Sequence, residues 1–367
     1  MPRYLELSAA PDTAVLQAAL NAVAARHEVL RMRFVQRADG TVQGLVASPA
    51  DFSVPLRVVS APSDKQEAAI LQAEAATPFD LSSQPLLRCT VVVRSGAGGT
   101  GGTGATLAMV MHHAVGDAWT RGIFEAEVVQ AYAATLAGKE PAWDPLPIQY
   151  ADWAAWSKEQ LAGEAGDELR QWWRQALVGA PPLLQLPMDR PRPAEPTFAA
   201  GLVQADLPAL LLGRLDDLAV QLRVNTQAVL LAAFQAVLLR YSGQDEVVVA
   251  VPVAGRDRPE AQGLVGYFIN TLPVRAVAAG GASWADMAQA ASRATLEALA
   301  HGALPVDQIL AAAQVQRIPG VNPLFQVSGC PVKRRRLSPW PGFIRTAGAV
   351  LRGLSSPKSV CSCPCIC

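Results

Sequence analysis

The chain has 367 residues, of which 51% are hydrophobic and 17% are charged, and its formal net charge is zero. This composition is typical of a folded globular protein. It excludes a disordered chain, which would be poorer in apolar residues and would carry more net charge. Zero net charge gives no reason to expect nucleic acid or an anionic membrane surface as a partner.

The first part of the chain, predicted to form a lobe over residues 1–182, alternates helical and strand patterns. The segment 13–35 begins with apolar residues at helical spacing and then passes into a strand pattern. Two further runs, 84–93 and 105–113, are apolar and partly β-branched, as strands are. The glycine-rich segment between them predicts a hairpin with a long loop.

The loop of this hairpin contains Gly96, Gly98 and Gly101 in the spacing G-x-G-x-x-G. That spacing matches the dinucleotide-binding fingerprint, in which the glycines open a helix whose N-terminus faces a pyrophosphate. A strand pattern follows the glycines here, so the sequence does not predict a nucleotide cofactor.

A proline-rich segment with alternating charge, 183–198, is predicted to link the first lobe to a second one over 199–329. The second lobe is expected to contain helices and two strands. In chain order these are the helical run 205–241, the strands 245–255 and 264–277, and the helix 283–302. Because strands alternate with helices on both sides of the linker, the sequence predicts an α/β fold of two lobes.

The last segment, 330–367, shows no sustained periodicity and combines the basic cluster Lys333–Arg336 with four alternating cysteines within 361–367. The cysteines could bind Cu(I) or Zn(II) through thiolates, and the basic cluster could be a nuclear localisation signal or a patch that contacts anions. The alternative is an unstructured, non-homologous tail. We favour that alternative, because the patterns of a fold end where this segment begins.

The remaining cysteine, Cys89, lies in an apolar run and is expected in the core. Five of six cysteines at or beyond residue 330 do not form the spread-out framework of a secreted disulfide protein. The N-terminus lacks a signal-peptide pattern, and the most apolar helical run, 227–241, is too short to cross a bilayer. A cytoplasmic protein is the expectation.

The segment MVMHHAVGDAWTRGIF, 109–124, places His112 and His113 at a strand exit, four or five residues before Asp117. As metal ligands the two histidines lack partners at workable spacing, and adjacent strand residues point to opposite faces. As core residues, each ring would need a hydrogen-bond partner. As catalytic groups, one ring would face a cleft and exchange protons near neutral pH.

The context of these histidines resembles the HHxxxDG motif of nonribosomal peptide synthetase condensation domains. Other blocks of that family follow in the family's order. They are RHEVLRMRF (26–34), PFDLSSQPLLR (78–88), IQYADWAAW (148–156), LPMDRPRP (186–193), LVGYFINTLPVR (264–275), the weaker HGALPVDQIL (301–310) and NPLFQV (322–327). The resemblance covers about residues 5 to 327.

The resemblance implies two chloramphenicol acetyltransferase-like lobes that form a V around a central tunnel. It also implies amide formation between aminoacyl thioesters carried on the phosphopantetheine arms of carrier proteins, with no cofactor bound directly. The expected partners are carrier domains upstream and downstream and an adenylation domain. Alternatives are a non-catalytic remnant or docking fragment of a synthetase, and a stand-alone acyltransferase of the same superfamily.

For the site, the resemblance implies that His113 faces the tunnel and takes the amine proton or positions the amine. His112 is expected to support the loop. Asp117 is expected to be structural and to pair with Arg88, which stands where the family places an arginine. The residues expected to line the tunnel are Ala118, Trp119, Asn270 and Thr271, although Asn270 and Thr271 could equally cap a strand end.

Three departures from the family weigh against full activity. Ala118 replaces the glycine of HHxxxDG, and a Cβ would cost about 1–2 kcal/mol if this position needed a positive φ. The family's opening strand and helix are missing before residue 5. The match stops at Val327, and the loss of paired strands would leave an exposed sheet edge.

Overall fold

The computed structural model describes residues 1–83, 85–94, 104–190, 193, 201, 203, 207–278, 280–329 and 351–353. Gly96, Gly98 and Gly101 of the predicted hairpin loop, residues 191, 192 and 194–198 of the predicted linker, and the basic and cysteine-rich clusters of the tail lie outside the described residues.

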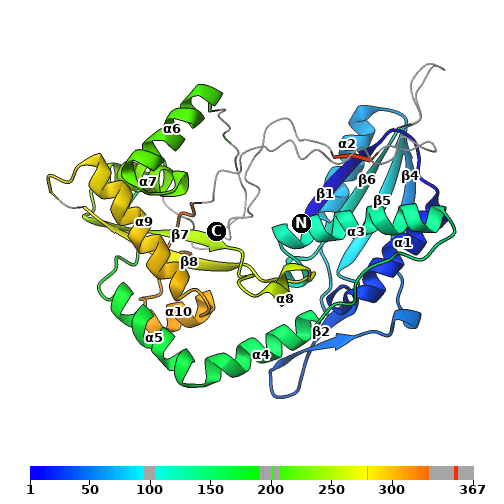
Figure 1. The fold of residues 1–367 in the computed structure, drawn as a ribbon, viewed down its shortest axis with the longest axis horizontal. Helices are drawn as coiled ribbons and strands as arrows, with labels where there is room; N and C mark the ends of the chain where they lie inside the picture. The colour runs from blue at the N-terminus through cyan, green and yellow to red at the C-terminus, as the bar shows by residue number, and fades with distance from the viewer. Residues whose placement is uncertain are drawn as a thin grey trace. The chain divides into compact units, whose positions relative to one another are not determined.

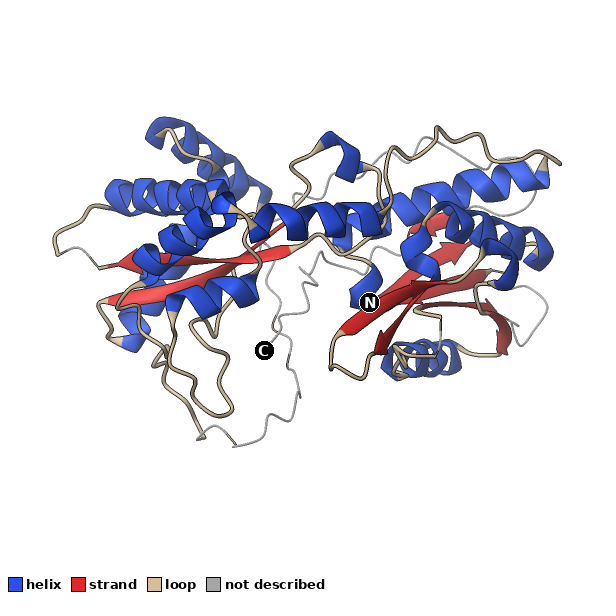
Figure 2. Cartoon of the chain, turned by 90° about the horizontal axis from the view of Figure 1, so that it is seen from below, coloured by secondary structure: helices blue, strands red, loops and turns tan. Residues whose placement is uncertain are grey.

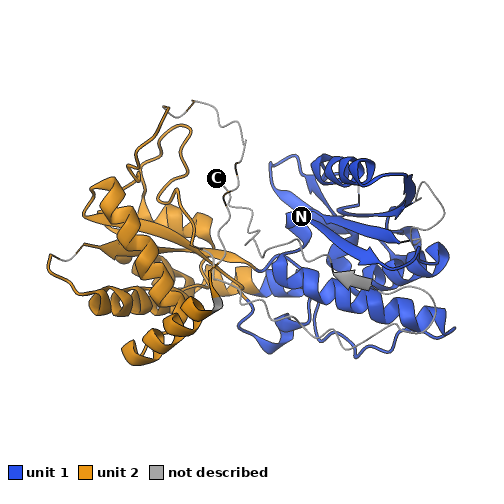
Figure 3. Ribbon diagram, turned by 90° about the horizontal axis from the view of Figure 1, so that it is seen from above, with its two compact units in different colours: residues 1–156, 256–268, 335–357 blue, residues 157–255, 269–334, 358–367 orange. Residues whose placement is uncertain are grey.

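The chain forms two compact units (Figure 3). Among the described residues, unit 1 comprises 1–156, 256–268 and 351–353, and unit 2 comprises 157–255 and 269–329. The division therefore differs from the predicted lobes. Unit 1 ends earlier in the sequence than residue 182, and it takes back the short segment 256–268, which we call the returning segment.

Unit 1 is built around a five-stranded sheet in the order β4-β5-β6-β1-β9 (Figure 1). The strands are β1 (Pro2–Leu7), β4 (Leu56–Ala61), β5 (Leu87–Arg94), β6 (Ala105–Met111) and β9 (Leu351–Gly353). β5 and β6 pair antiparallel, as the two apolar runs predicted, and β4 pairs parallel to β5. β1 lies between β6 and β9 and is antiparallel to both.

Both faces of this sheet are covered (Figure 2). Every second residue of β6, from Ala105 to Met111, joins the main hydrophobic core with helices α1 (Thr13–Arg26) and α3 (Ala118–Leu136). Thr106 points to the other face and bonds to Glu67 of α2 (Asp64–Ala76). Because side chains alternate along a strand, the two faces of β6 contact two different layers of helices.

Unit 1 also holds a second, smaller sheet and shorter helices. These are β2 (Met32–Gln36) paired with β3 (Val42–Val46), the 3-10 helices η1 (Glu28–Arg31), η2 (Pro49–Asp51) and η3 (His113–Val115), the first half of α4 (Tyr150–Ala162), and α8 (Pro259–Gln262). The helix and strand expected over 13–35 are confirmed as α1 and β2.

Unit 2 packs helices on the antiparallel pair β7 (Glu246–Val253) and β8 (Asn270–Val277). Its helices, apart from the end of α4, are α5 (Glu164–Leu177), α6 (Ala209–Leu222), α7 (Thr226–Ser242), α9 (Trp284–Ala300) and α10 (Val306–Ala313). On its other side, β7 forms one parallel bridge, between Ala250 and Ser328.

Two sequence predictions in unit 2 need correction. The run over 205–241 is two helices, because Arg223 adopts a left-handed conformation and the Asn225 side chain caps the next helix. The strand expected over 264–277 begins only at Asn270, because the preceding residues belong to the returning segment. The helix expected over 283–302 is confirmed as α9.

No single helix among the described residues is long and apolar enough to cross a membrane. Helices α6 and α7 reach that length and composition only as a pair, and they are bent by 99° at their break.

Candidate active site

The two histidines lie on a short connection between β6 and α3. The backbone N–H of His112 donates to the Leu86 carbonyl at 2.8 Å, which extends the pairing of β6 with the β5 side by one residue. The 3-10 turn of η3 follows, and Asp117 then caps α3 by accepting a bond from the Thr120 N–H at 2.7 Å. The motif therefore consists of the end of a strand, one 3-10 turn and the N-cap of a helix.

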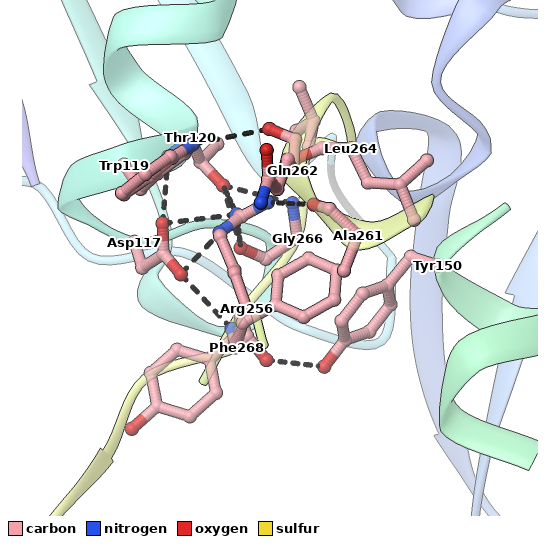
Figure 4. A network of polar contacts seen from close by, with 12 residues as sticks. Asp117, Trp119, Thr120, Tyr150, Arg256, Ala261, Gln262, Leu264, Gly266 and Phe268 are labelled. Atoms are coloured by element: carbon pink, nitrogen blue, oxygen red, sulfur yellow. Dashed lines mark hydrogen bonds and ion pairs between the residues drawn. The ribbon is translucent and has the colours of Figure 1, made fainter. Parts of the chain in front are cut away.

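The Asp117 carboxylate is buried, with its side chain 3% exposed, and both of its oxygens are used. Oδ1 caps α3, and Oδ2 accepts from the Phe268 N–H at 3.1 Å. Its ionic partner is Arg256, whose Nη2 lies 3.4 Å from Oδ1 (Figure 4). A buried carboxylate needs such partners, because an unpaired buried charge is strongly destabilising.

Arg256 fixes the returning segment around this carboxylate. Its Nη1 donates to the carbonyls of Ala261 and Leu264 at 2.6 and 2.7 Å, and its Nη2 donates to the Thr120 hydroxyl at 3.0 Å. The guanidinium also lies over the ring of Phe268, 3.9 Å from its centroid. Burial lowers the pKa of Arg256, and Asp117 opposes that change.

The predicted pairing of Asp117 with Arg88 is wrong. Arg88 lies on β5, with its Nε 3.6 Å from a carboxylate oxygen of Glu74, and it donates to the carbonyls of Glu74 and Thr77. Its guanidinium also covers the ring of Phe79 at 4.0 Å. These contacts tie β5 to the end of α2, whereas Asp117 lies at the start of α3 and is served by the returning segment.

His113 is half-buried at the start of η3. Its Nδ1 is buried and has no hydrogen-bond partner among the described residues. Its ring meets the ring of Tyr267 edge to face, with centroids 5.2 Å apart and planes at 81°. Burial lowers the pKa of His113; the carbonyls of His113 and Gly116, and Asp117, act in the opposite direction.

His112 has a different environment although it is adjacent. Its Nδ1 accepts a hydrogen bond from the Ala114 N–H at 3.0 Å, so the ring itself caps the 3-10 turn. Its ring meets Phe79 edge to face at 5.9 Å. Burial lowers the pKa of His112 as well.

Ala118 and Trp119 occupy the first turn of α3. Both residues are exposed. Ala118 is helical and does not have a positive φ, so the strain expected from replacing the motif glycine is absent. Trp119 donates from its indole N–H to the Gln262 carbonyl at 3.2 Å and so contacts the returning segment.

Asn270 and Thr271 open β8 in unit 2. The Asn270 amide donates to the carbonyls of Gly302 and Leu304, both at 2.8 Å, and its side-chain oxygen accepts from the backbone N–H groups of Thr271 and Val306. Its polar atoms thus all serve to hold the 302–306 turn against the start of the strand, as a strand-end cap does.

Sequence reasoning missed the residues that complete the site, namely Thr120, Tyr150, Arg256 and Gly266. The Thr120 hydroxyl donates to the Gly266 carbonyl at 2.6 Å and accepts from the Gly266 N–H at 3.0 Å. A Cβ at Gly266 would lie 2.2 Å from the Tyr150 ring, so any other residue would require a shift of the surrounding atoms. The motif match to 264–275 marked this block but did not indicate which strand or helix it contacts.

The described residues contain no group of three or more histidine, cysteine or acidic side chains that could hold a metal ion. Hydrogen bonds and one buried ion pair organise the part of the site that the structure describes.

Comparison with known proteins gives the family. A family model for the condensation domain matches residues 1–328. The chain is 39% identical over 319 residues to phosphinothricin tripeptide synthetase PhsB of Streptomyces viridochromogenes, a match that covers 86% of this chain and 26% of that protein. It is 34% identical over 330 residues to malpinin synthetase of Mortierella alpina, covering 89% of this chain and 4% of that protein.

Solved structures agree. The X-domain from teicoplanin biosynthesis matches with a TM-score of 0.81 and 27% identity, over 89% of this chain and 72% of that chain. The first condensation domain of the calcium-dependent antibiotic synthetase matches with a TM-score of 0.69 and 22% identity, over 90% and 73% of the two chains, and shows the fold alone. The fold is the mixed α/β, chloramphenicol acetyltransferase-like one. The chain therefore belongs to the condensation-domain family of nonribosomal peptide synthetases.

Proposed function

We propose that this chain forms amide bonds between carrier-bound acyl or aminoacyl thioesters, with His113 as the group that handles the amine proton. The observation that carries the proposal is the contrast between the two histidines. His112 uses Nδ1 to cap a turn, whereas the half-buried His113 ring has its Nδ1 buried without a partner among the described residues. In this proposal Nε2 of His113 is the atom that meets the substrate.

In the proposed step, the acceptor amine attacks the carbonyl carbon of the donor thioester. A C–N bond forms and the C–S bond breaks, so the donor carrier's phosphopantetheine leaves as a thiol and the lengthened product stays on the acceptor carrier. His113 Nε2 takes the proton that the amine loses, and that proton ends on the departing sulfur. Positioned proton transfer typically contributes about 10²–10⁴-fold to a rate.

The direction of the His113 pKa suits this role. Burial lowers it below the ordinary 6.5, so the ring is neutral at pH 7 and is able to accept a proton. Asp117 does not touch the ring through a hydrogen bond, and in this proposal it is the residue that fixes the turn that carries His113.

The partners are proposed from the family. The chain spans only 26% of PhsB and 4% of malpinin synthetase, and the parts that charge and present substrates are therefore proposed to be carrier and adenylation domains elsewhere. Phosphopantetheine arms would bring the substrates. We propose a cytoplasmic location, because adenylation consumes ATP and Cys89, the cysteine that the structure describes, is a buried free thiol.

The test is a single-turnover assay on the full chain. One carrier protein bears an N-acetyl-aminoacyl thioester and a second bears a free aminoacyl thioester, across a panel of amino acids, and mass spectrometry follows the mass gain of the second carrier. We expect product with the parent chain and a loss of about 10²–10⁴-fold in His113→Ala. The matched control is His301→Ala in unit 2, which should react like the parent. Equal rates for His113→Ala and the parent would overturn the proposal.

The pH profile sharpens the same test. Acid protonates both the acceptor amine, whose ordinary pKa is about 8, and His113, whose pKa lies below 6.5. The parent rate should therefore fall with a slope of about one per pH unit below the amine pKa and about two below the His113 pKa. In His113→Ala the steeper limb should be absent.

A second candidate function is docking without turnover. It is favoured by the similarity to the X-domain from teicoplanin biosynthesis. A solved structure of that domain is a complex with OxyB, and it matches this chain with a TM-score of 0.80. A chain that binds loaded carriers or an accessory protein but yields no product with any donor and acceptor of the panel would support this candidate over the first.

A further inference from the structure

We propose that Tyr267 is a positioning residue that sets the orientation of the His113 ring, an inference that deepens the proposed function and rests on it. Tyr267 belongs to the returning segment, whose neighbours in the sequence belong to unit 2, while His113 lies at the end of β6. The second half of the sequence would thus contribute the surface against which the reactive ring is held.

The backbone on either side of Tyr267 is fixed at three successive residues. Gly266 exchanges two hydrogen bonds with the Thr120 hydroxyl, at 2.6 and 3.0 Å. The Tyr267 carbonyl accepts from the Tyr150 hydroxyl at 2.8 Å, and the Phe268 N–H donates to Asp117 at 3.1 Å (Figure 4). These bonds fix the backbone conformation at Tyr267 and therefore the direction of its Cα–Cβ bond.

The contact between the two rings is an edge-to-face pair. Centroids 5.2 Å apart with planes at 81° fall within the range that aromatic rings prefer, because the positive edge of one ring meets the negative face of the other. Such pairs have a defined geometry, so they orient a ring as well as bury it.

His113 needs this contact more than its neighbour does. The His112 ring is oriented twice, by the Ala114 N–H on its Nδ1 and by Phe79. The described residues give His113 no completed hydrogen bond on Nδ1, so packing has to set the ring angle. A proton acceptor that turns away from the amine loses the alignment on which the transfer depends.

Among the described residues, three charged or titratable groups besides Tyr267 act on the His113 ring. They are Asp117, which favours the protonated ring, the amine of Met1, which disfavours it, and the neighbouring His112. The edge-to-face contact needs the ring of Tyr267 and not its hydroxyl. A Tyr267→Phe variant therefore separates the ring from the hydroxyl.

The first readout needs no substrate. The chain has four histidines, so the NMR signals of the His113 imidazole can be assigned by single replacement of each and titrated in the full chain. We expect Tyr267→Ala to raise the His113 pKa toward 6.5, because the ring becomes hydrated, and Tyr267→Phe to leave it as in the parent. Tyr267→Leu, which fills more of the space, serves if the alanine variant does not fold.

The second readout is kinetic. In the carrier assay, Tyr267→Ala or Tyr267→Leu should lower the single-turnover rate about tenfold without changing the concentration of acceptor carrier that gives half the maximal rate. Tyr267→Phe should react like the parent. The matched control is Phe79→Ala, which removes the equivalent ring from His112; it should change the His112 titration and leave both the His113 titration and the rate as they were.

Three results would overturn the inference. The first is a parent-like His113 titration and rate in Tyr267→Ala and Tyr267→Leu. The second is a loss in Tyr267→Phe as large as in Tyr267→Ala, which would assign the effect to the hydroxyl. The third is an equal loss in Phe79→Ala, which would indicate general loosening. Full activity in His113→Ala refutes the proposed function instead, and the titration still tests the ring contact.

Discussion

The two units differ in the size of their sheets and in how well their apolar side chains are buried. The five-stranded sheet of unit 1 has helices on both faces, and the buried side chains there form one large core. The described residues of unit 2 form one pair of strands, with one parallel bridge at Ser328 on the other side of β7. Large apolar residues on α6 and α7 are exposed, among them Leu210, Val220 and Tyr241. The histidine motif lies in unit 1, whose sheet is covered by helices on both faces.

The returning segment, which packs against the motif in unit 1, comes from far along the chain. Val265 of the returning segment joins the main core of unit 1, and Arg256 and Phe268 close around Asp117. The HHxxxD turn is therefore local in sequence but is not stabilised by local contacts alone, because its aspartate is held by residues 139 and 151 positions away.

The largest effect should follow removal of the buried cation. Arg256→Ala leaves Asp117 buried and unpaired and frees the carbonyls of Ala261 and Leu264, so we expect a loss of about 3–5 kcal/mol in the free energy of unfolding. Urea unfolding at pH 7 measures it. The matched control is Arg258→Ala, two residues on, whose side chain is 55% exposed and whose removal should cost little. Equal losses in the two variants would contradict the assignment.

A smaller loss should follow crowding of the same junction. In Gly266→Ala the new Cβ would lie 2.2 Å from a Tyr150 ring carbon, and the shift needed should cost about 1–3 kcal/mol. Gly263→Ala, where no atom lies within 4 Å of the added Cβ, is the control. If thermal or urea unfolding ranked the two variants alike, the close packing of the returning segment against Tyr150 would be refuted.

Removal of the other arginine should have a smaller effect. Arg88→Ala breaks a 3.6 Å ion pair with Glu74 and two bonds to carbonyls near the end of α2, and we expect about 1–2 kcal/mol. The single-turnover rate should stay at the parent value, because these contacts do not reach Asp117. A loss as large as that in Arg256→Ala would restore the pairing that the family resemblance implied.

The smallest effect should come from restoring the motif glycine. Ala118→Gly introduces the more flexible residue into the first turn of α3, so stability should fall by about 0.5–1 kcal/mol. The rate should not rise, because Ala118 is helical and has no backbone strain to relieve. A rate increase without loss of stability would show that the Cβ obstructs substrate.

The local elements could be predicted because their signals are local. The apolar run of β6 and the helical patterns of α1 and α9 each act within a few residues. The break between α6 and α7 was missed because Arg223 is not a residue type that favours the left-handed conformation, although Asn225 is a common cap.

The long-range pairing could not be predicted from periodicity. Arg88 and Arg256 are both arginines in or beside strands, and nothing in the spacing indicates which of them meets Asp117. The deciding feature is that residues 256–268 pack in unit 1, which depends on the burial of Val265 and Phe268 rather than on any motif. The family resemblance identified the motif aspartate and implied the wrong arginine for it.

The most direct test of the pairing between Asp117 and Arg256 is a pair of double-mutant cycles, measured by urea unfolding of the full chain. One combines Asp117→Asn with Arg256→Gln, and the other combines Asp117→Asn with Arg88→Gln. We predict a coupling energy of about 1–3 kcal/mol in the first cycle and about zero in the second. Additive effects in the first cycle, or coupling in the second instead, would contradict the claim that the returning segment holds the motif aspartate.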